Sequence, residues 1–123
     1  MILKRIQGEE MRDEIIVYCK DEEDIRETFK YIKELNRFKE SVIHKDKAEF
    51  SNYTKDKKRE IRIRCITLKE NTRGIKGNIG LLTKSFNQQL KDNKDIYWSI
   101  IQPSINSYTN GIIAPLSILK EII

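Results

Sequence analysis

The sequence predicts an α+β protein: a single small domain in which a mixed or antiparallel sheet is packed against two to three helices. Short runs of β-branched residues recur along the chain, and an amphipathic segment with helical spacing lies between two of them. A chain of 123 residues suffices for one hydrophobic core but not for two. We therefore expect one domain spanning residues 1–123.

Two strands and a helix are predicted in the N-terminal third. Ile2 to Ile6 is typical of a short strand, and Glu14 to Cys19 is β-branched densely enough for a central strand, so the two suggest a hairpin. The next segment, Glu22 to about Phe38, is predicted to be a helix because apolar residues recur at helical spacing after acidic residues that can cap it. The capping candidates and the apolar stripe are Asp21 or Asp24, and Ile25, Phe29, Ile32 and Leu35.

The middle of the chain contains one weak and one clear pattern. Residues Ser41 to Lys58 fit either two short strands around a turn or a long loop. Ile61 to Leu68 alternates as a strand does, which places Arg62 and Arg64 on the face opposite Ile61, Ile63 and Cys65.

Three elements are predicted after the glycines at positions 74, 77 and 80. These glycines are expected to form a turn that leads into a helix from Leu81 to Leu90. Ile96 to Ile101 is apolar on both faces and predicts a buried strand ended by Pro103. A helix is expected from about Ala114 to Ile123, with Pro115 in its first turn.

Composition restricts the class of protein. The 24 Lys and Arg exceed the 19 Asp and Glu, giving a net charge of +5, which favours anionic partners but is moderate for a dedicated nucleic-acid binder. Cys19 and Cys65 lie in apolar runs without metal-type spacing, so we expect buried free thiols on opposite faces of the sheet. With neither a secretory signal nor a membrane span, the sequence predicts a cytoplasmic protein without a membrane partner.

The main functional hypothesis is a non-enzymatic small binding protein that engages a phosphate-bearing ligand or nucleic acid. Arginine side chains on the strand engage phosphates bidentately, and backbone N–H groups of a tight glycine turn can cradle an anion. The alternative for this segment is a solvated surface and a plain connecting turn. The predicted ligand-binding residues are Lys58, Arg59, Arg62, Arg64, Arg73, Gly74, Lys76, Gly77 and Gly80, with Tyr108 in a polar loop from Gln102 to Gly111.

The second hypothesis is an interaction or assembly protein, such as an inhibitor or a structural subunit of a virus or mobile element. It would act through the apolar C-terminal residues Leu116, Leu119, Ile122 and Ile123, toward a protein partner or a second copy of the chain. No catalytic motif, metal-ligand spacing or cofactor signature is present, so neither an enzyme nor a cofactor is expected.

Overall fold

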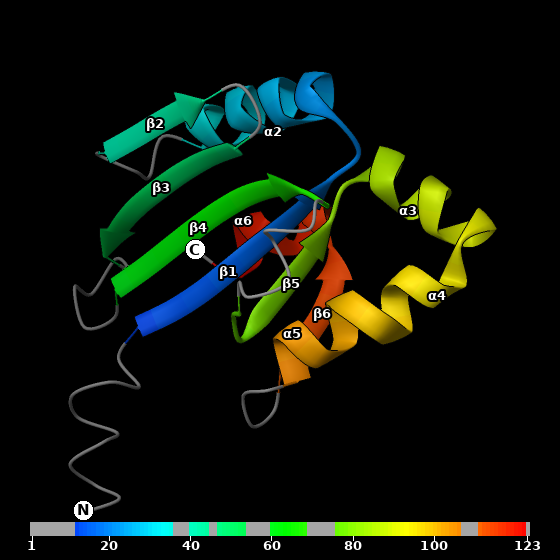
Figure 1. The fold of residues 1–123 in the computed structure, drawn as a ribbon. Helices are drawn as coiled ribbons and strands as arrows, with labels where there is room; N and C mark the ends of the chain where they lie inside the picture. The colour runs from blue at the N-terminus through cyan, green and yellow to red at the C-terminus, as the bar shows by residue number, and fades with distance from the viewer. Residues whose placement is uncertain are drawn as a thin grey trace, which may run out of the picture.

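The computed structural model describes residues 12–35, 40–44, 47–53, 60–68, 76–106 and 111–122. In these residues six strands form one mixed sheet in the order β2-β3-β4-β1-β5-β6 (Figure 1). The central strand β1 is parallel to both of its neighbours, β4 and β5, and β6 is parallel to β5. β3 is antiparallel to both of its neighbours, β2 and β4. The strands are β1 (Arg12–Cys19), β2 (Glu40–His44), β3 (Lys47–Tyr53), β4 (Glu60–Thr67), β5 (Ile79–Leu82) and β6 (Ile112–Pro115). The predicted α+β class is confirmed.

Helices cover both faces of the sheet and enclose two apolar cores. Behind the sheet in Figure 1 lie α2 (Glu22–Glu34) and α6 (Leu119–Ile122), the latter preceded by the short 3-10 turn η3 (Leu116–Ile118). The other face is covered by α3 (Lys84–Asp92), α4 (Lys94–Ile96), the π-helical turn η2 (Tyr97–Ile101) and α5 (Gln102–Asn106). No helix in the described part of the chain is long and apolar enough to cross a membrane.

In the N-terminal third the predicted central strand and helix are confirmed, but the predicted hairpin is wrong, because β1 pairs with β4 on one edge and with β5 on the other. β1 contains the predicted central strand, and its alternate residues enter the two different cores. Asp21 caps α2 by accepting the Asp24 N–H at 2.9 Å. The helix ends at Glu34 with Leu35 as its C-cap, earlier than predicted. The predicted strand from Ile2 to Ile6 lies outside the described residues.

The two middle strands resolve the weak pattern. β2 and β3 pair antiparallel, so of the two alternatives for this region the structure shows the two short strands, at residues 40–44 and 47–53. In β4, Ile61, Ile63 and Cys65 enter the core under α2 while Arg62 and Arg64 take the other face. The predicted alternation is therefore confirmed.

The prediction of a strand from Ile96 to Ile101 is wrong, because this segment is helical. The buried apolar side chains are Ile101 and Ile105, and Tyr97 packs against the same core, which gives a spacing of four residues. Trp98 is exposed. Pro103 does not end the segment; it lies in α5, within the loop predicted from Gln102 to Gly111.

The boundaries of the last elements also differ from the prediction. Leu81 and Leu82 belong to strand β5, and α3 begins at Lys84 because Thr83 caps it by accepting the Phe86 N–H at 3.1 Å. Near the C-terminus, residues 112–115 form strand β6 alongside β5, where a helix was predicted from about Ala114. Regular helix begins only with α6.

Both cysteines are free and buried, as predicted, but they lie on the same face of the sheet. The expectation of opposite faces is wrong, since the side chains of Cys19 on β1 and Cys65 on β4 both belong to the core under α2. A hydrogen bond with the Cys19 side chain, together with burial, raises the pKa of Cys65 well above its usual range. These thiols pack as small apolar side chains.

Because Tyr18 is buried, we expect the free energy of unfolding to depend on pH in the alkaline range. Burial raises the pKa of Tyr18 to about 12, against the opposing effects of a hydrogen bond with Ser104 and the charge of Arg64. The folded-state pKa lies above the unfolded value of 10, so this contribution is complete below pH 10 and is lost as pH rises to about 12. We expect it to amount to about 2 to 3 kcal/mol. Urea unfolding across this pH range measures it.

The matched control is Tyr18→Phe, which has no phenol to ionise. Because the Cys65 thiol contributes in the same alkaline direction, the difference between the wild-type and Tyr18→Phe profiles isolates the tyrosine. Parallel profiles above pH 10 would show that the phenol ionises equally easily in the folded and unfolded states.

Candidate ligand-binding site

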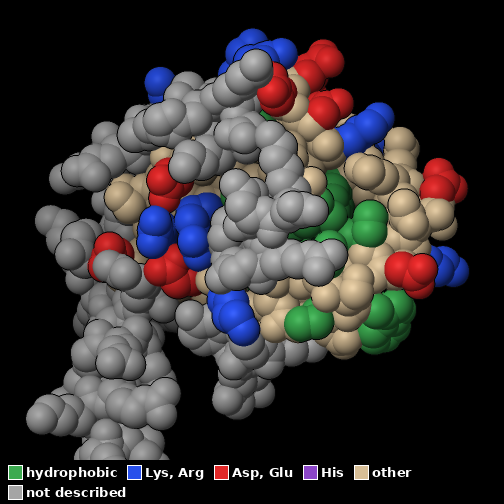
Figure 2. Space-filling model, in the orientation of Figure 1, with side chains coloured by type: hydrophobic (Ala, Val, Ile, Leu, Met, Phe, Trp, Pro, Cys, Tyr) green, Lys and Arg blue, Asp and Glu red, His purple; other side chains and the backbone are tan. Residues whose placement is uncertain are grey.

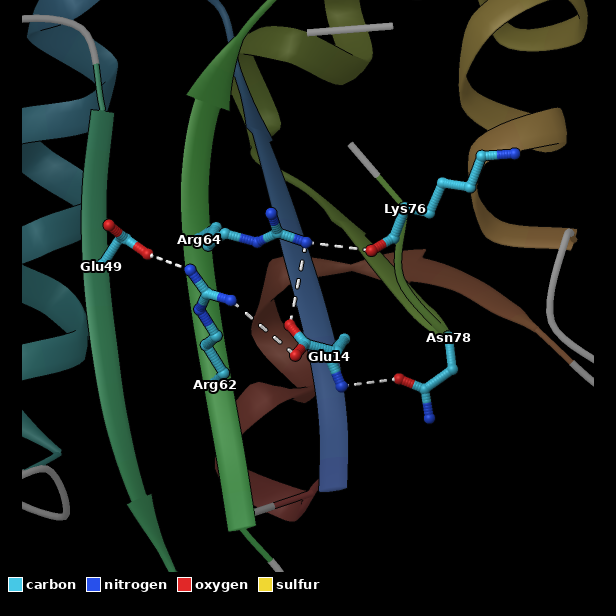
Figure 3. A network of polar contacts seen from close by, with 6 residues as sticks. All are labelled: Glu14, Glu49, Arg62, Arg64, Lys76 and Asn78. Carbon is cyan, nitrogen blue, oxygen red and sulfur yellow. Dashed lines mark hydrogen bonds and ion pairs between the residues drawn. The ribbon is translucent and has the colours of Figure 1, made fainter. Parts of the chain in front are cut away.

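The two arginines of β4 lie among carboxylates. Arg62 contacts Glu49 on β3 at 2.8 Å and Glu14 on β1 at 4.0 Å, and Arg64 lies 3.7 Å from Glu14 (Figure 3). Parallel register produces this cluster, because Glu14 is directly opposite Arg62. Figure 2 shows the same mixture of basic and acidic side chains on the left of this face. The charges of both guanidinium groups are therefore balanced within the fold.

The predicted basic strand and the segment before β5 do converge. Arg64 donates to the backbone carbonyl of Lys76 at 2.9 Å. The ammonium end of Lys76 extends away from this cluster and is exposed (Figure 3). The contact thus uses the backbone of Lys76 and places no third cation beside Arg62 and Arg64.

Gly77 and Gly80, the two glycines of the predicted anion-binding turn that the structure describes, have backbone positions within the fold. The Gly77 N–H donates to the Ser104 carbonyl at 3.3 Å, and Gly80 lies inside β5 between β1 and β6. Leu81 is a strand residue and does not start a helix. The prediction that Gly77 and Gly80 offer free amides to a ligand is therefore wrong. Lys58, Arg59, Arg73, Gly74 and Tyr108 lie outside the described residues.

The predicted C-terminal interface also changes. Leu119 is fully buried in the core under α2, so it is not available to a partner. Leu116 is half-buried and contributes to the cavity described next. The side chain of Ile122 and the whole of Ile123 lie outside the described residues.

A cavity of about 690 Å³ opens beyond the carboxyl ends of β5 and β6. Three of its apolar side chains pack against the core under α2, and three pack against the core under α3 to α5. It therefore lies where the two layers of the protein meet. The lining residues are Tyr31, Leu82, Thr83, Lys84, Asn87, Tyr97, Ile113, Ala114, Pro115, Leu116 and Ser117.

Chain direction explains why a cavity forms at this place. β5 leads into α3 on one face of the sheet, whereas the neighbouring parallel strand β6 leads into η3 and α6 on the other. The connections separate and leave space outside the strand ends. In open sheets with parallel strands, ligands bind at this type of divergence.

Hydrogen bonds hold one wall of the cavity in place. Thr83 caps α3 and also donates its hydroxyl to the buried carboxylate of Asp24 at 2.5 Å. Asp24 accepts in addition the N–H of Lys20 at 2.8 Å. The end of β1, the start of α2 and the start of α3 are thereby joined through one carboxylate.

The charge of the lining is positive. Of the described residues that line the cavity, Lys84 alone carries a charge. It is the first residue of α3, whose first turn contains no acidic residue, in contrast to the acidic first turn of α2. The helix dipole also favours an anion at this end.

The residues of this site were not among those predicted from the sequence, apart from Leu116, which was assigned to an interface. A local signal was present: Thr83 precedes a helical stripe that begins without the usual acidic residues. The contributions of Tyr31 and Tyr97 follow only from the fold, since they belong to distant elements.

Comparisons of this chain with protein-family models, with curated proteins and with solved structures find no match. Among the described residues, no group of three or more His, Cys, Asp and Glu side chains is placed to hold a metal ion.

Proposed function

We propose that this chain is a non-enzymatic binding protein for a small organic anion, held in the cavity beyond β5 and β6. The cavity itself is the observation that carries the proposal. Its volume of about 690 Å³ lies in the range of small-molecule sites, and such sites combine apolar walls with a few polar groups. Leu82, Ile113, Ala114, Pro115 and Leu116 supply the apolar walls.

Lys84 supplies the preference for an anion. Lys84 is exposed and lines the cavity, and none of the other described lining residues is acidic. An ammonium group forms charge-assisted hydrogen bonds with phosphate, sulfonate or carboxylate oxygens. The net charge of +5 adds a long-range attraction for such ligands.

The phosphate-bearing ligand inferred from the sequence fits this cavity better than it fits the arginine strand. A ligand that used Arg62 and Arg64 would have to displace Glu14 and Glu49 from their ion pairs. A ligand at Lys84 displaces no ion pair that the structure records. A nucleic-acid interface on β4 is accordingly the weaker candidate.

A pair of dyes tests the proposal. Anilinonaphthalene sulfonate has an aromatic body and one anionic group, and N-phenylnaphthylamine has a similar body without the charge. Trp98 is the only tryptophan and adjoins the lining residue Tyr97, so energy transfer from it reports a dye bound nearby. We expect Lys84→Ala to weaken binding of the sulfonate about tenfold and to leave the uncharged dye unchanged.

Lys91→Ala is the matched control. Lys91 is also an exposed lysine of α3, so its loss changes the net charge equally, but it is not part of the cavity lining. We expect this variant to bind both dyes like the wild-type protein. Equal losses in the two variants, or no energy transfer from Trp98 with either dye, would refute the proposed site.

A further inference from the structure

Two tyrosines line the cavity from opposite layers of the protein. Tyr31 belongs to α2 and packs against the core on that face, whereas Tyr97 belongs to η2 and packs against the other core. Both residues are half-buried, and both line the cavity. Trp98 meets Tyr97 edge to face, with ring centroids 5.1 Å apart and planes at 86°.

We propose that the anion bound here is a nucleoside monophosphate, with its base among the tyrosine rings and its phosphate at Lys84. This inference rests on the proposed function and names the ligand class of the same site. A nucleotide base stacks on an aromatic side chain whichever of the four bases it is, because every base has a π-face. An aliphatic anion of similar size would fill the cavity without using the rings.

The charge of the cavity selects one phosphate group. Lys84 is the single charged residue among the described lining residues, so it matches a single phosphate. A triphosphate brings additional negative charges, and sites for it use several cationic groups or a metal ion. Nothing comparable lines this cavity within the described chain.

The polar lining residues suit a sugar. Asn87 lies three residues after Lys84 on α3, so the two side chains emerge on the same side of the helix, and both line the cavity. Its amide group both donates and accepts hydrogen bonds. Ser117 contributes a hydroxyl from the other side of the sheet. The sugar of a nucleotide carries hydroxyl groups between the base and the phosphate, and these can form hydrogen bonds with such polar side chains.

The inference is tested by isothermal titration of the full chain with adenosine, guanosine, cytidine and uridine monophosphates. We expect binding of all four monophosphates, and affinities at least tenfold weaker for adenosine, for adenosine triphosphate and for inorganic phosphate. Tyr97→Leu should weaken adenosine monophosphate about tenfold, because it removes one stacking surface. Tyr97→Phe retains the ring and should bind like the wild-type protein.

The outcomes separate this inference from the proposed function. If anilinonaphthalene sulfonate binds in a Lys84-dependent manner but no monophosphate does, the nucleotide class is wrong and the anion site stands. If Tyr97→Leu and Tyr97→Phe reduce binding equally, stacking is not the mode of recognition and the inference fails. If neither dye nor nucleotide binds, both proposals fail.

Discussion

Replacing Gly77 with alanine is expected to destabilise the protein by about 3 kcal/mol or more, because backbone atoms leave no space for a side chain there. A Cβ atom at this position would lie 2.6 Å from the carbonyl oxygen of Glu14 and 3.1 Å from Ile16. That same carbonyl accepts the N–H of Asn78 at 3.0 Å, and the Asn78 side chain accepts the Glu14 N–H at 2.8 Å. Relief of the clash would therefore disrupt the pairing of β1 with β5.

Gly80→Ala is the matched comparison. Its Cβ would meet side-chain atoms of Ile105 at 2.9 and 3.1 Å, and a side chain can adjust where a backbone carbonyl cannot. Urea unfolding followed by circular dichroism should give a smaller loss of stability for Gly80→Ala than for Gly77→Ala. A fully stable Gly77→Ala that no longer binds anions would instead support the glycine turn as a ligand site.

Removal of the Asp24 carboxylate is the second large effect that we expect, at about 2 to 4 kcal/mol for Asp24→Ala. The carboxylate is buried and accepts hydrogen bonds from the Thr83 hydroxyl and the Lys20 N–H. Alanine leaves both donors without this acceptor and removes the connection between α2 and α3. Because Thr83 lines the cavity and precedes Lys84, binding of anilinonaphthalene sulfonate should weaken as well.

The control for this variant is Asp21→Ala, which removes another aspartate from the start of α2, three residues before Asp24. Asp21 is exposed and caps α2 through one recorded side-chain hydrogen bond, to the Asp24 N–H, so its loss should cost about 1 kcal/mol. Chemical unfolding of both variants measures the difference. If Asp24→Ala proved no worse than Asp21→Ala, the buried carboxylate would be no more than a helix-capping residue.

Sequence reasoning succeeds where a periodic pattern repeats within one element. The alternation in β4 separates Arg62 and Arg64 from the buried residues, and the apolar stripe of α2 has the spacing of a single covered face. These patterns are local, so neighbouring residues suffice to read them.

It fails where burial depends on distant partners. Residues 96–101 are apolar enough for a strand, and only the continuation to Ile105 reveals the four-residue spacing of a helix. β5 and β6 have four residues each, too few for a clear alternation, and their parallel pairing joins segments some thirty residues apart.

The two candidate sites show the same dependence on the fold. Arginines on β4 resemble a free basic strip until the register of β1 places Glu14 beside them. The cavity combines residues from α2, β5, α3, η2, β6 and η3, so no contiguous sequence motif predicts it. The sequence shows where the charged residues lie along the chain. Whether an arginine is neutralised by a carboxylate, and whether a cavity is enclosed, depends on how the strands and helices pack.

We expect the anion site to lie beyond the ends of β5 and β6 and not on the arginine-bearing strand β4. Backbone amide chemical shifts of isotope-labelled protein, recorded while anilinonaphthalene sulfonate is added, locate the site directly. We predict that the largest changes fall in residues 82–87 and 113–117, which contain most of the cavity lining. Changes centred on Arg62 and Arg64, with none at the start of α3, would contradict the account.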